Sequence, residues 1–177
     1  MTSTFKKPGT PMHDLLLLLM AGQLSAAPLG HEKALVLLFV RSDCPISNRY
    51  APDLQRLYQE YSPRGFEFRL IYPEPGLTPA AMEEHRREYA YTIPGAIDAD
   101  HQYVKRTEVT VTPEVAVFVR GGLVYRGRID DRYVSVGKER PRALHHDLQD
   151  VLAAILTGET VAFHETAAIG CAIEKPE

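Results

Sequence analysis

The sequence lacks several features that would place it at once in a common functional class. It contains only two cysteines, Cys44 and Cys171, and no pair with the Cys-x-x-Cys spacing of a zinc site. Its formal net charge of −3 provides no basic field, which argues against nucleic acid as a partner. It has no tryptophan, no internal repeat and no low-complexity tract. With 45% hydrophobic and 24% charged residues, the 177-residue chain is typical of one globular domain that buries its own core.

The first 27 residues combine positive charge, a short apolar run and small residues, which are the parts of an export signal. These parts are Lys6–Lys7, Leu15–Ala21 and Leu24–Ala27. We therefore predict that residues 1–27 are a signal peptide and that 28–177 form a single domain with a tail at about 158–177. The mature protein would be periplasmic or secreted, with no membrane segment, because the apolar run is too short to span a bilayer. The alternative is a docked N-terminal amphipathic helix and a cytoplasmic protein, since Asp14 adjoins the apolar run.

The apolar pattern predicts alternating strands and helices, and therefore an α/β fold. Strands are expected at 35–40, 66–72 and 93–98, a glycine-turn hairpin at 115–119 and 123–128, and helices at 44–61, 78–89, 101–106 and 141–156. Pro52 should kink the first helix or separate a short first turn from it. The last helix should place Leu144 on its apolar face and end at Gly158. This order implies a central sheet with helices on both faces.

Cys44 lies where the first strand gives way to the first helix, and Pro45 follows it. Backbone N–H groups at a helix start lack intrahelical partners and carry partial positive charge, so they stabilise a thiolate there. We therefore expect the pKa of Cys44 to lie below that of a free thiol. The alternative is a buried structural cysteine.

Three motifs resemble those of thioredoxin-fold proteins, more narrowly the redoxins grouped with alkyl hydroperoxide reductases and thiol-specific antioxidants. Cys44-Pro45-Ile46-Ser47 occupies the place of the thioredoxin Cys-x-x-Cys turn, Thr112-Pro113 that of the cis-proline facing it, and Gly121–Gly127 that of the closing hairpin. The resemblance covers residues 34–157. It implies a three-layer sandwich with a mixed central sheet, and a cis bond between Thr112 and Pro113 in front of Cys44.

The sequence also departs from these families. Ser47 stands where a thioredoxin has its resolving cysteine, and a hydroxyl cannot resolve a mixed disulfide. Peroxiredoxins have proline and a hydroxyl residue before the cysteine, where this chain has Leu37 and Arg41. A local dithiol cycle is therefore excluded, and the peroxide-binding motif is absent.

Several residues near Cys44 are candidates to support it. Ser47 is a candidate hydrogen-bond donor to the thiolate, and Arg41 and Arg49 are candidates to lower its pKa. Asp43 is expected to cap the helix. The alternatives are a serine that satisfies the backbone and two ordinary surface arginines.

Cys171 lies in a weakly patterned tail, and three roles are open to it. It is a distant resolving cysteine for Cys44, half of a permanent disulfide, or an unpaired thiol. A further alternative is a copper site in which both thiols join a histidine such as His85 or His164. Asp98, Asp100 and His101 cluster in a loop and are candidate ligands for a cation, although a solvated turn is the simpler interpretation.

The leading hypothesis is a thiol–disulfide oxidoreductase with Cys44 as nucleophile, which acts on a protein or small-molecule disulfide and needs no cofactor. Pro113 would shape the groove that receives an extended substrate. Peroxide is a weaker candidate for the substrate. The rival hypotheses are the copper-binding module and a non-catalytic scaffold that keeps a structural disulfide.

Overall fold

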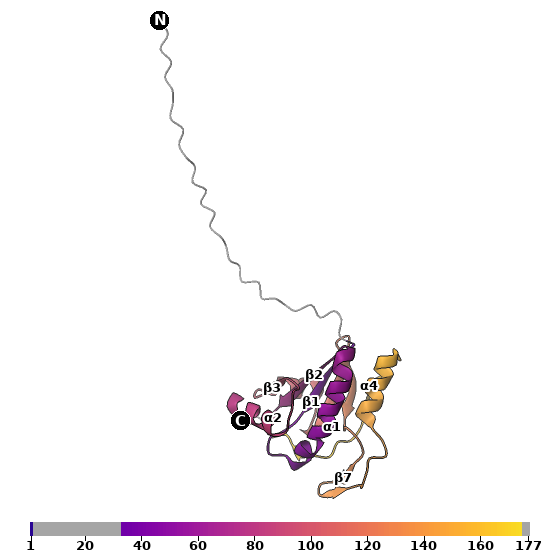
Figure 1. Cartoon of the computed structure of the whole chain (residues 1–177). Helices are drawn as coiled ribbons and strands as arrows, with labels where there is room; N and C mark the ends of the chain where they lie inside the picture. The colour runs from indigo at the N-terminus through magenta and orange to yellow at the C-terminus, as the bar shows by residue number, and fades with distance from the viewer. Residues whose placement is uncertain (2–32, 175–177) are drawn as a thin grey trace.

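The computed structural model describes Met1 and residues 33–174 (Figure 1). Apart from Met1, the predicted signal peptide at residues 1–27 lies outside the described residues. The helices are α1 (Pro45–Tyr61), α2 (Pro79–Glu88), α3 (Gln102–Thr107) and α4 (Asp147–Thr157), with a 3₁₀ turn at Ser62–Arg64. The strands are β1 (Ala34–Phe39), β2 (Phe66–Tyr72), β3 (Gly95–Ile97), β4 (Val111–Thr112), β5 (Glu114–Val119), β6 (Gly122–Gly127), β7 (Tyr133–Ser135), β8 (Lys138–Glu139), β9 (His164–Glu165) and β10 (Cys171–Ala172).

Six strands form the central sheet in the order β3-β2-β1-β5-β6-β9. The sheet is mixed, because β1, β2 and β3 run parallel while β5 runs antiparallel to both β1 and β6. The continuous apolar sequence of β1 fits its place in the middle, where both faces are covered. No helix among the described residues is both long enough and apolar enough to cross a membrane.

Helices cover both faces of this sheet, as predicted. Alternate residues of β1 divide between two apolar clusters: Val36 and Leu38 belong to the one that contains α1, α4 and Met82 of α2. Leu37 belongs to the second cluster, against which Tyr103 of α3 packs. The three-layer, thioredoxin-like sandwich inferred from the resemblance is therefore confirmed (Figure 1).

The last helix begins later than the sequence predicts, at Asp147 rather than near Pro141. The carboxylate of Asp131 accepts hydrogen bonds from the backbone N–H groups of Leu144 (2.6 Å) and His145 (3.0 Å), which holds this segment as a loop. Leu144, expected on the buried face, is 63% exposed as a result. The end of the helix at Gly158 was predicted correctly.

The proline inside α1 does not divide the helix. Pro52 lies within one element that runs from Pro45 to Tyr61, so the alternative of a separate first turn was wrong. The neighbouring Ala51 and Leu54 are both buried against the sheet, and this packing supports the helix where Pro52 cannot donate a backbone hydrogen bond.

Candidate functional site

Cys44 lies at the N-terminus of α1, as the sequence predicted, and is its N-terminal cap, directly before Pro45. Its backbone is extended, with φ −88° and ψ 111°, and its carbonyl accepts the first helical hydrogen bond from Asn48 (3.0 Å). The first turn of α1 contains no acidic residue. The partial positive charge of the first-turn N–H groups is therefore available to the sulfur of Cys44.

Cys44 forms a disulfide with Cys171, 127 residues further along the chain. The two Cα atoms are 6.1 Å apart, within the range usual for disulfides. Cys44 is fully buried, whereas Cys171 is partly exposed. The unpaired-thiol alternative for Cys171 was therefore wrong, and the redox pair and the permanent disulfide remain.

The peptide bond between Thr112 and Pro113 is cis and lies against the disulfide, as predicted. The Thr112 carbonyl oxygen is 3.2 Å from the Sγ atom of Cys44. The buried carboxylate of Glu114 accepts hydrogen bonds from the backbone N–H groups of Thr110 (2.8 Å) and Val111 (3.3 Å). Glu114 therefore holds the segment that precedes Pro113, a role that the sequence analysis missed although Glu114 adjoins the motif.

The tail is bound to this segment rather than loose. β10 pairs antiparallel with β4, with Cys171 opposite Thr112, and β9 pairs with β6. Gly170 lies so close to the Thr112 carbonyl that an added Cβ would overlap it. The weak patterning of residues 158–177 therefore concealed two short strands, because two residues are too few to show a periodicity.

A chain of partly buried hydrogen bonds fixes the turn between β1 and Cys44. Glu74 accepts from the backbone N–H and the hydroxyl of Ser42 (2.7 and 2.6 Å), and the Asn48 amide donates to the Ser42 carbonyl (2.9 Å). Because Asn48 Nδ2 is a donor, its Oδ1 accepts from Nε2 of His85 (2.9 Å). Burial lowers the pKa of His85, which favours the neutral ring, and in that form Nδ1 accepts from the hydroxyl of Tyr72 (2.9 Å).

This arrangement predicts a loss of stability at acid pH. Burial lowers the pKa of His85 below its ordinary value of 6.5, against the smaller opposing effects of Glu74 and Glu88. Between the two pKa values the unfolded chain binds more protons, so the unfolding free energy should fall as pH decreases through 6.5. His85→Gln should cost about 1–3 kcal/mol at pH 7, because it breaks the buried hydrogen bond to Tyr72 and the partly buried one to Asn48.

The measurement is urea denaturation between pH 7.5 and 5 for the wild type, His85→Gln and the exposed-site control His164→Gln. His85→Gln should show a smaller decline toward acid pH, whereas the control should follow the wild type. Equal declines in all three proteins would contradict the assignment.

The three residues proposed to support Cys44 differ in burial and in their partners. Ser47 lies one turn after Cys44 and is buried, and its hydroxyl has no hydrogen-bond partner among the described residues. Arg41 is paired with Asp43 and with Glu174 of the tail (2.9 Å). Arg49 is exposed and paired with Glu139 of β8 (3.3 Å). Carboxylates thus offset the charge of both arginines.

Asp43 does not cap α1, contrary to the prediction. Cys44 itself occupies the cap position, and α1 has no side-chain capping hydrogen bond. The carboxylate of Asp43 pairs instead with the Arg41 guanidinium.

The candidate metal ligands have other partners. Both ring nitrogens of His85 are engaged, and the carboxylate of Asp98 accepts from the backbone N–H groups of Tyr103 (3.2 Å) and Val104 (3.0 Å). His101 is hydrogen-bonded to the Pro73 carbonyl (2.7 Å). The described part of the chain contains no group of three or more His, Cys, Asp or Glu arranged for a metal ion.

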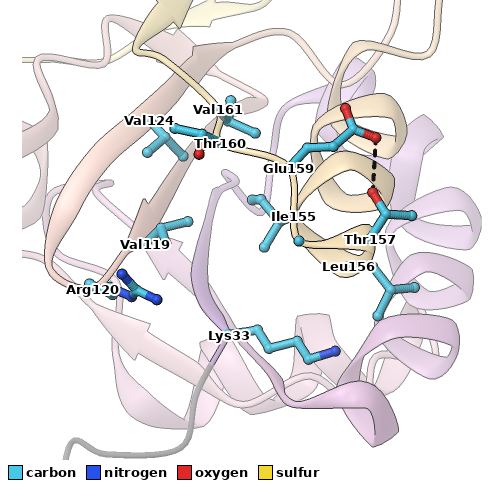
Figure 2. A pocket seen from close by; sticks show the side chains of 11 residues that line it. Lys33, Val119, Arg120, Val124, Ile155, Leu156, Thr157, Glu159, Thr160 and Val161 are labelled. Atoms are coloured by element: carbon cyan, nitrogen blue, oxygen red, sulfur yellow. Dashed lines mark hydrogen bonds between the residues drawn. The ribbon is translucent and has the colours of Figure 1, made fainter.

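A cavity of about 670 Å³ lies between the hairpin of β5 and β6 and the C-terminal end of α4 (Figure 2). It is lined by Lys33, which precedes β1, by residues of the β5–β6 hairpin, and by the last turn of α4 with the residues that follow it. Cys44 follows the opposite end of β1. The cavity therefore does not belong to the disulfide site.

Solved structures share this fold. A hypothetical protein from Sinorhizobium meliloti is 24% identical, with a TM-score of 0.71 over 82% of this chain and 81% of its own. An uncharacterized conserved protein from Geobacillus kaustophilus is 27% identical, with a TM-score of 0.71 over 81% and 78%. A protein assigned as thiol:disulfide interchange protein DsbE of Chlorobium tepidum is 17% identical, with a TM-score of 0.55 over 71% and 82%.

Comparison with protein families gives a more specific result. No curated protein matches the chain. The Redoxin family model matches residues 7–143, a range that contains the helix cap at Cys44 and the cis bond at Pro113. The match ends before α4 and before the tail that carries Cys171. More than half of the chain fits the family model, and the protein therefore belongs to the redoxin family.

Proposed function

We propose that this redoxin is a thiol–disulfide oxidoreductase in which Cys44 and Cys171 alternate between a disulfide and two thiols. The observation that carries the proposal is the bond between a sulfur at the N-terminus of α1 and a partly exposed sulfur in the tail. A cysteine at a helix N-terminus, as Cys44 is, is both a good nucleophile and a good leaving group, because the helix stabilises its thiolate. The structural likeness to a thiol:disulfide interchange protein is consistent with this reaction.

The reaction transfers two electrons from the protein to a disulfide substrate. The Cys44 thiolate attacks one substrate sulfur, the substrate S–S bond breaks, and one substrate thiolate leaves. The Cys171 thiolate then attacks Sγ of Cys44, which restores the protein disulfide and releases the second substrate thiolate. An external dithiol returns the two electrons in two further thiol–disulfide exchanges, which open the protein disulfide and oxidise the dithiol.

Neighbouring residues support Cys44 in this scheme. The unpartnered hydroxyl of Ser47 is a donor for the thiolate once the disulfide opens. Pro113 and Thr112 shape the surface on which the substrate lies, and Pro45 begins the helix without the loss of a needed N–H group. Arg41 and Arg49 have positioning roles, because each is paired with a carboxylate: Arg41 holds Glu174 of the tail, and Arg49 holds Glu139 of β8.

We further propose that the protein works outside the cytoplasm. A disulfide persists most readily in an oxidising compartment, and residues 1–27 retain the composition of an export signal.

The first test is turnover. Cys44→Ser should reduce the rate of disulfide-substrate reduction to the uncatalysed level, a loss of at least about 100-fold, because a hydroxyl cannot carry out thiol exchange. The assay follows reduction of a protein disulfide substrate with dithiothreitol as electron donor. Leu144→Ser, at an exposed loop position, is the matched control and should keep the wild-type rate. A wild type that resists mild reductant and shows no turnover would instead support the permanent structural disulfide.

A further inference from the structure

The strand beside the cis bond is completed by the chain's own tail. Cys171 pairs with Thr112 and Ala172 with Val111, and the backbone N–H of Ile173 donates to the Thr110 carbonyl (3.0 Å). Among the described residues, β4 has no strand partner other than β10. Without the tail, β4 would present an unpaired edge, the kind of surface to which an extended segment of another chain adds as a strand.

The tail fits this edge by its side chains as well as by its backbone. Gly170 lies against the Thr112 carbonyl and the nitrogen of Pro113, where an added Cβ would overlap the backbone. Ile173 packs against the apolar cluster on the second face of the sheet. Glu174 pairs with Arg41 (2.9 Å). The segment 170–174 therefore places a small, an apolar and an acidic residue at defined positions around Cys171.

The two sulfurs differ in access. Cys44 is fully buried, whereas Cys171, which is bonded to it and pairs with Thr112 of β4, is partly exposed. An external thiolate therefore reaches Cys171 first. It forms a bond with Sγ of Cys171, the Cys44–Cys171 bond breaks, and the electron pair remains on Cys44 as a thiolate at the helix N-terminus. The second thiolate of the reductant then attacks the reductant's first sulfur, which is bonded to Cys171. The mixed disulfide breaks, the reductant becomes an internal disulfide, and Cys171 leaves as a thiolate.

We propose that residues 170–174 are an internal occupant of a polypeptide-binding edge on β4, and that reduction of the disulfide opens this edge to a partner. The role of the edge in turnover rests on the proposed function. The partner that fits is an extended segment in which a small residue precedes a cysteine, followed by an apolar and an acidic residue two and three positions after that cysteine. The oxidised protein is closed to such a segment because its own tail is covalently held in place.

Gly170 is the residue that positions the tail against β4. Alanine at this position should displace the tail from the Thr112 carbonyl while both sulfurs remain in the chain. Gly122→Ala is the matched control, because a Cβ there would meet only the Val119 carbonyl, at an ordinary 3.6 Å, and Gly122 has no positive φ.

The experiment measures binding of a fluorescein-labelled peptide with the sequence of residues 167–175 and serine in place of Cys171, so that no covalent bond forms. Fluorescence anisotropy is recorded with the oxidised and reduced wild type, Cys171→Ser, Gly170→Ala and Gly122→Ala. The reduced forms and Cys171→Ser should bind at least about tenfold more tightly than the oxidised wild type, because a tethered tail competes at high effective concentration. Reduced Gly170→Ala should bind most tightly, and Gly122→Ala should match the wild type in each redox state. A second peptide with alanine at the Gly170 position should not bind.

Amide hydrogen exchange of the wild type provides a measurement that needs no variant. The Ile173 amide, hydrogen-bonded to Thr110, should exchange at least about tenfold faster after reduction, while amides of β1 keep their protection. Equal peptide binding by the oxidised and reduced wild type, or unchanged Ile173 exchange, would overturn the inference. Turnover by the wild type without peptide binding by any variant would refute the binding edge alone, whereas peptide binding by Cys171→Ser together with no turnover by the wild type would refute the proposed function and leave the edge standing.

Discussion

Replacement of Cys171 by serine is expected to stop turnover after its first bond-forming step. The Cys44 thiolate can still attack a substrate disulfide, but Ser47 stands where a local resolving thiol would be, and a hydroxyl cannot resolve the mixed disulfide. The covalent complex should therefore accumulate, and turnover should fall by at least about 100-fold while the rate of the first step is retained.

Mass spectrometry of the protein mixed with a disulfide substrate checks this result. Cys171→Ser should carry one substrate adduct on Cys44, and Cys44→Ser should carry none there. Ser47→Cys combined with Cys171→Ser should recover part of the turnover, because it places a thiol one helical turn after Cys44. Undiminished turnover in Cys171→Ser would mean that an external thiol resolves Cys44, and it would remove the catalytic role of the tail.

The disulfide is expected to make the largest single contribution to the stability of the fold. It joins residues separated by 127 positions, and the chain-entropy model gives up to about 5 kcal/mol for a loop of this length. Oxidised wild type should therefore unfold at higher guanidinium concentration than Cys171→Ser, and its Tm should be higher by about 10–20 °C for a chain of this size.

Denaturation under non-reducing conditions measures this difference. Wild type in dithiothreitol should unfold together with Cys171→Ser, since both lack the same covalent link. A difference between these two would assign part of the loss to the serine itself. Coincident transitions for the oxidised wild type and Cys171→Ser would contradict a stabilising disulfide and favour a tail that is weakly held in both redox states.

Much of the fold follows from local features of the sequence. The apolar run that forms β1 predicts a covered central strand, Thr78 before Pro79 predicts the start of α2, and the double glycine at 121–122 predicts the hairpin of β5 and β6. Cys44 before Pro45 likewise predicts a cysteine at the start of a helix. These features depend on neighbours in the chain, so their physical causes can be read from short stretches of sequence.

Other features were decided only by tertiary contacts. Asp131 holds the N–H groups of Leu144 and His145, so α4 begins later than its apolar pattern predicts. Asp43 pairs with Arg41 instead of capping α1, because the next residue, Cys44, takes the cap position with its extended backbone.

By itself the sequence determined that Cys44 follows strand β1 and lies at the start of α1. It also determined that Ser47 stands where a local resolving cysteine would be, so that any resolving thiol within the chain must come from a distant position. It left open whether Cys171 meets Cys44, because two-residue strands have no periodicity and pairing across 127 positions leaves no local signal. The tertiary structure decided that question by placing β10 on the edge of β4. The bare backbone of Gly170 permits this close approach, which brings the two sulfurs within bonding reach.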